Sequence, residues 1–109
     1  MAKTLDFTTR KKEFFTVKLD DEKQTVLLIG TPTKNVMQDF LALNMEELED
    51  AQAINEIYEV CAKVMSFNKG GIKITSDYLS NECNFDIADI MTFFNAYSDF
   101  ISEISHAKN

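Results

Sequence analysis

The sequence has few residues that interrupt regular structure, with three glycines and one proline among its 109 residues. We find no linker, internal repeat or low-complexity tract, so no boundary between domains is indicated. The length falls in the commonest range for one domain, and a hydrophobic content of 45% is enough to build a core. These features predict a single folded domain.

Side chains for catalysis and metal binding are equally scarce. The one histidine, His106, lies close to the C-terminus, where a frayed helix end cannot hold a base in place. Cys61 and Cys83 have no metal-ligand spacing, and we interpret them as free thiols in a reducing compartment. The acidic residues among 46–50 lack a Glu-x-x-His motif, and residues 30–34 lack the full pattern of a phosphate-binding loop. The sequence therefore predicts no enzyme, no metal and no cofactor.

Charge and hydropathy argue against nucleic-acid and membrane partners. The formal net charge is -7, and four basic residues against Asp6 give residues 1–12 a charge of +3, which leaves -10 for the remainder. An acidic body repels phosphate backbones. No run of apolar residues is long enough to span a bilayer, and the start lacks the apolar run of a signal peptide, so we expect a soluble cytoplasmic protein. We interpret residues 1–12 as a flexible basic segment. The alternative is that Lys11 and Lys12 bind an acidic surface of a partner.

An alternating pattern predicts an antiparallel β-hairpin over residues 14–29. Phe15, Val17 and Leu19 alternate with polar residues, as in a half-buried strand, and residues 26–29 form a second β-rich run. The polar residues 20–23 between them make a loop of hairpin length. Because a hairpin of two strands alone is only marginally stable in water, it must pack on the helices or pair with strands of another copy.

Helical segments are expected after the hairpin, at about residues 32–43, 45–67, 77–82 and 85–106. Thr31 with Pro32 suits the start of the first, Asn44 with Glu47 resembles a capping box, and Asn84 can cap the last. The expected fold class is therefore α+β, a mainly helical single domain over residues 13–109 with an N-terminal antiparallel hairpin.

The last third of the chain holds a wide apolar helical stripe. Its members recur three and four residues apart: Ile87, Ile90, Phe94, Tyr97, Ile101 and Ile104. Phe93 and Phe100 widen the stripe on one flank. The centre of such a stripe is core by default, whereas aromatic pairs at its rim are common anchors of interfaces. We name Phe93, Tyr97, Phe100 and Ile104 as candidate partner-binding residues, with core packing as the alternative.

Several stretches are informative in their order along the chain: FTTRKK (7–12), FFTVKL (14–19), PTK (32–34), IMTFFNAY (90–97), FISEI (100–104) and AKN (107–109). In the order of these stretches and in their residue types, the chain resembles the tail assembly chaperones of long-tailed phages and prophages of Gram-positive bacteria. These are short proteins made just before the tape measure protein.

The resemblance implies a non-catalytic assembly factor of the host bacterial cytoplasm. Such a factor binds the tape measure protein, helps to recruit tail tube subunits around it, forms homo-oligomers and is absent from the finished virion. Residues 20–23 lack the glycine expected in the family's hairpin turn, which predicts a longer or looser loop. The alternative function is a small cytosolic adaptor or regulatory protein that docks an amphipathic helix onto another protein.

Overall fold

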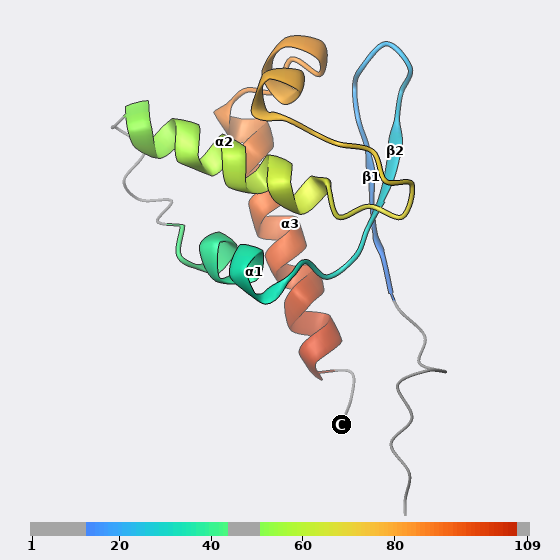
Figure 1. Ribbon diagram of the computed structural model, residues 1–109, viewed down its shortest axis with the longest axis vertical. Coiled ribbons are helices and arrows are strands. Elements are labelled where there is room, and N and C mark those ends of the chain that lie inside the picture. The colour runs from blue at the N-terminus through green and yellow to red at the C-terminus, as the bar shows by residue number, and fades with distance from the viewer. Residues whose placement is uncertain (1–12, 44–50, 107–109) are drawn as a thin grey trace, which may run out of the picture.

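The computed structural model describes residues 13–43 and 51–106. Its elements follow the order β1 (Phe15–Lys18), β2 (Val26–Ile29), α1 (Lys34–Leu41), α2 (Ala51–Met65), the π-helical turn η1 (Tyr78–Glu82) and α3 (Ile87–His106). The hairpin stands at one side of the three α-helices (Figure 1). The predicted α+β fold class, mainly helical with an N-terminal antiparallel hairpin, is confirmed. The basic segment 1–12 and the predicted helix start at residues 44–47 lie outside the described residues.

The hairpin has two different edges. Its register joins Phe15 to Ile29 and Lys18 to Val26. The outer edge of β2 meets the segment that follows α2, because the Lys69 amide donates to the Leu28 carbonyl at 2.9 Å and the Gly30 amide to the Phe67 carbonyl at 2.9 Å. Among the described residues, no backbone pairs with the outer edge of β1.

The turn between the strands is ordered by Asp21. Its carboxylate accepts hydrogen bonds from the Thr25 amide at 2.7 Å, from the Thr25 hydroxyl at 2.6 Å and from the Tyr78 hydroxyl of η1. In the absence of glycine, Gln24 takes a positive φ of 50°. The loop is therefore long, as expected, but it is closed rather than loose.

Two helix starts differ from the prediction. The first helix begins at Lys34 rather than at residue 32, with Thr33 in extended backbone before it. Asn84 does not cap α3, because it takes a positive φ of 56° in the preceding connection. Asp86 is the cap: its carboxylate accepts from the Asp89 amide at 3.0 Å, and the Asp89 carboxylate accepts from the Asp86 amide at 3.0 Å. This reciprocal pair satisfies two helix-start amides, as a capping box does.

Tyr97 of α3 lies at the centre of the core. Its side chain is fully buried, and its ring centroid lies 5.7 Å from that of Phe15 in β1 and 5.4 Å from that of Phe40 in α1. Its hydroxyl donates to the Gly30 carbonyl at 2.7 Å. Burial raises the pKa of Tyr97 well above its usual range, so the hydroxyl stays protonated and remains a donor. This one side chain joins α3 to the hairpin and to α1.

Candidate functional site

Two of the predicted partner-binding residues belong to the core. The exposed fraction is 6% for Phe93 and 0% for Tyr97. The Phe93 ring stacks on that of Tyr97 at 5.6 Å and meets that of Phe15 edge-on at 6.2 Å. The placement of Phe93 at an exposed rim is therefore wrong, because β1 covers that flank of α3. Phe93 and Tyr97 therefore offer a partner almost no surface in this fold.

The remaining candidates lie further along α3 or outside the described residues. Phe100 is half-buried, and its ring centroid lies 5.4 Å from that of Phe15 and 5.8 Å from that of Tyr97. Ile104 is also partly exposed. The structure thus brings Phe93, Tyr97 and Phe100 together around Phe15. Lys11 and Lys12 lie outside the described residues.

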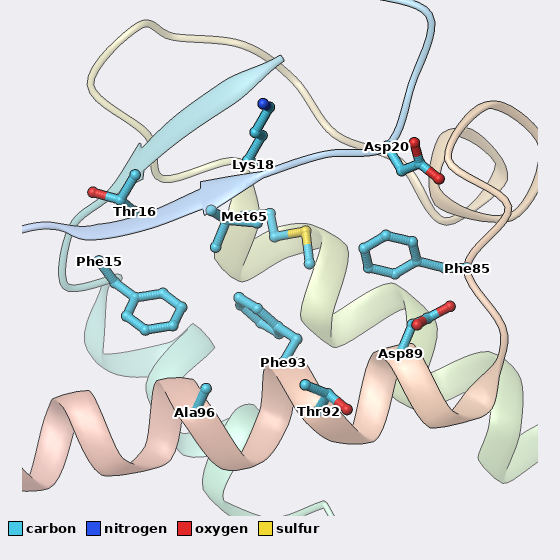
Figure 2. A pocket seen from close by; sticks show the side chains of 11 residues that line it. Phe15, Thr16, Lys18, Asp20, Met65, Phe85, Asp89, Thr92, Phe93 and Ala96 are labelled. Carbon is cyan, nitrogen blue, oxygen red and sulfur yellow. The ribbon is translucent and has the colours of Figure 1, made fainter. Parts of the chain in front are cut away.

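A groove of about 370 Å³ opens between β1 and the first half of α3. Figure 2 shows Phe15 directed toward α3, whereas Thr16 and Lys18 are directed to the other side of the strand. Met65 of α2 and Phe93 of α3 lie at the bottom of the groove, and both side chains are buried. The sequence does not indicate this groove, because it arises from the way in which β1 crosses α3.

One end of the groove is acidic. Asp20 comes from the hairpin turn and Asp89 from the first turn of α3, and Asp86 precedes that helix. Burial, followed by the charges of Asp86 and Asp89, raises the pKa of Tyr58. Burial, followed by the charges of Asp21, Asp20 and Glu82, raises the pKa of Cys83 to about 11. In the described part of the chain, no ion pair neutralises Asp20, Asp86 or Asp89, so this end offers negative charge to a partner.

The other face of the hairpin carries exposed apolar side chains. Val26 is 53% exposed and Leu28 is 37% exposed, and they alternate along β2 with residues that point into the core. Phe14 is 37% exposed, and the amine of Lys69 lies 5.8 Å from its ring centroid. We call Phe14, Val26 and Leu28 the outer hairpin face. The signal was present in the sequence, because an unbroken apolar run of four residues in a strand places apolar side chains on both faces.

The described residues include few side chains suited to nucleophilic catalysis or metal binding. Both cysteines are free and buried, and burial raises the pKa of Cys61 to about 12, so neither thiol is an activated nucleophile. Within residues 13–43 and 51–106, no cluster of histidine, cysteine, aspartate and glutamate side chains is arranged to hold a metal ion. The acidic residues among 46–50 fall outside these ranges. None of the helices in the same ranges is both long and apolar enough to cross a membrane.

Comparisons with protein-family models, with curated proteins and with solved structures find no match to this chain.

Proposed function

We propose that this chain is a tail assembly chaperone of a long-tailed phage or prophage. In this role it is a non-catalytic protein of the host bacterial cytoplasm that binds the tape measure protein and helps to recruit tail tube subunits. It acts as a homo-oligomer and is absent from the finished virion. The observation that carries the proposal is the outer hairpin face, an apolar surface on an otherwise acidic domain.

A chaperone of this kind must bind an apolar helical client and stay soluble. Exposed apolar side chains that gather on one surface mark sites of interaction. On the outer hairpin face, Val26 and Leu28 lie side by side on β2, and the cations Lys18 and Lys69 flank them. The formal net charge of -7 favours solubility of the complex. We infer that an amphipathic helix of the tape measure protein lays its apolar side on this face.

The alternative function, an adaptor that docks a helix of its own onto a partner, has less support. Its candidate helix was the apolar stripe of α3, which buries Ile90, Phe93 and Tyr97 in the core of the domain. An adaptor would have to use another element.

Co-expression with candidate tape measure and tail tube proteins of a long-tailed phage, followed by pull-down, tests the proposal. The variant Val26→Thr with Leu28→Thr places a β-branched side chain, which suits a strand, at both positions and removes apolar surface. We expect it to keep the thermal midpoint of the wild type and to lose the tape measure protein.

The matched control is Leu41→Ser, because Leu41 is 64% exposed on α1, away from the hairpin. This control should retain the client. The proposal is wrong if the wild-type chain captures no tape measure protein, or if the double variant captures as much as the control.

A further inference from the structure

We propose that the outer edge of β1 binds an extended, basic segment of a partner protein. The segment adds to the hairpin as a third strand, and a lysine or arginine of the segment lies at the acidic end of the groove. This site is on a different side of the hairpin from the outer hairpin face. The inference therefore goes beyond the proposed function and does not depend on it.

The first support is the unpaired edge of β1. The Leu19 amide donates to the Thr25 carbonyl across the hairpin at 2.8 Å. Because backbone groups alternate in direction along a strand, the amides and carbonyls of Thr16 and Lys18 point away from β2. No described segment pairs with them, whereas residues 67–69 cover the outer edge of β2. Such an edge is a template for an added strand.

The second support is the position of the groove, which follows this same edge. The four residues of β1 line it and no residue of β2 does, so it lies on the outer side of β1. The side chains of Thr16 and Lys18 are directed to the other side of the strand, so it is their backbone that faces the groove (Figure 2). A strand that pairs with this backbone therefore extends into the groove.

The walls of the groove offer apolar surface to such a strand. Phe15 of β1, Phe85 of the connection before α3 and Ala96 of α3 all line the groove and are partly exposed. Alternate side chains of a strand share one face, so every second residue of the added strand is directed toward this surface. The groove therefore favours a segment whose alternate residues are apolar.

The third support is charge, which specifies the partner. Asp20 and Asp89 line one end of the groove and are both exposed, and neither forms an ion pair with a described residue. Figure 2 shows the ring of Phe85 between their carboxylates. A lysine or arginine has an apolar stem and a cationic head, so its stem contacts the ring while its head meets the carboxylates. A basic residue is therefore attracted to this end, and an acidic one is repelled.

Synthetic peptides test the inference on the full-length chain. The probe has about eight residues, enough to span β1 and the acidic end, and alternates valine with serine. One version carries arginine near its N-terminus and another near its C-terminus, because the added strand can run in either direction. Fluorescence anisotropy measures binding. We expect one arginine probe to bind, and its counterpart with glutamate in place of arginine to bind at least about tenfold more weakly.

Backbone methylation shows whether the probe binds as a strand. Methyl groups on every second peptide amide block the hydrogen bonds along one edge of the probe and leave its side chains unchanged. Two methylated probes carry the methyl groups on the two alternate sets of amides. Because only one set faces β1, we expect one of these probes to lose binding and the other to retain it.

Asp20→Lys tests the charge. The position is exposed, and we expect the variant to bind the arginine probe about tenfold more weakly and the glutamate probe more tightly than the wild type does. Asp99→Lys is the matched control, because it makes the same charge change at an exposed position of α3 outside the groove. This control should bind both probes as the wild type does.

Thr16→Pro tests the edge. The substitution removes an outward amide that pairs with no described segment, so it should keep the fold, monitored by circular dichroism, and lose the probe. Thr16→Val retains the amide and a β-branched side chain, so it should keep both the fold and the probe. If Thr16→Pro unfolds, the two methylated probes still decide whether a strand is added.

The inference is overturned if no arginine probe binds the wild type, if the two methylated probes bind equally, or if Asp20→Lys changes binding no more than Asp99→Lys. It is also overturned if folded Thr16→Pro binds the probe like Thr16→Val. An edge already occupied by a second copy, or by another part of the same chain, would give the first of these results.

The proposed function is tested separately, because Val26→Thr with Leu28→Thr leaves the edge of β1 intact. A chain that binds the arginine probe but captures no tape measure protein would contradict the proposed function and leave this inference standing.

Discussion

Truncation of Phe93 distinguishes the core position seen in the structure from the exposed rim expected from the helical stripe. The side chain is 6% exposed and contacts the rings of Phe15 and Tyr97. Truncation of a core phenylalanine to alanine costs about 3–5 kcal/mol. The open groove lies beside Phe93, so solvent can enter the space left by the ring, which places Phe93→Ala toward the lower value of about 3 kcal/mol.

That loss is a large share of the stability of a small domain, which is typically about 5–15 kcal/mol. Urea unfolding of Phe93→Ala should show a lower midpoint with an unchanged slope, and the thermal midpoint should fall by more than about 10 °C. Phe100→Ala is the matched control, because Phe100 contacts the same two rings but is only half-buried, and it should cost roughly half as much. A loss below about 1 kcal/mol for Phe93→Ala, together with loss of a partner, would refute the core assignment.

Two predictions concern titratable groups. The hydrogen bond from the Thr25 hydroxyl, followed by that from Tyr78, lowers the pKa of Asp21 from 3.8 to about 2. Because the folded pKa is depressed, the contribution of Asp21 to stability is present above its ordinary pKa and is lost as the pH falls from about 4 toward 2. Asp21→Asn should flatten this part of the stability profile measured by urea unfolding; an unchanged profile would contradict it. Burial raises the pKa of Cys61 to about 12 and that of Cys83 to about 11, so both thiols should react with a disulfide reagent at about pH 8 only after unfolding. Rapid reaction of the native chain would show that at least one of them is accessible.

The elements of this fold follow from local patterns, whereas their mutual placement does not. Alternation at residues 15–19 predicts β1, and the three-and-four spacing from Ile87 predicts α3, because strand and helix periods depend on near neighbours. The flank of α3 that meets the hairpin depends on the path of the whole chain. For this reason Phe93 was predicted at a rim although β1 covers it.

Asp21 shows the same limit for a polar residue. Within its own segment it belongs to a polar loop, and only the position of η1 brings Tyr78 within hydrogen-bond reach, across 57 residues of sequence. The outer edge of β1, with which none of residues 13–43 and 51–106 pairs, is also not apparent from the sequence, since an edge is defined by what does not pair with it. The outer hairpin face, in contrast, could have been inferred from the apolar run in β2.

The hydrogen bond from Tyr97 to the Gly30 carbonyl has a consequence for the synthesis of the chain. The hairpin leaves the ribosome first, but two strands are marginally stable alone, and the rings that cover β1 belong to the last helix. Folding of the hairpin must therefore wait until residues near 97 have emerged. Until then the apolar side chains of β1 and β2 are exposed to solvent. The nascent chain is therefore most prone to aggregate while it is still attached to the ribosome.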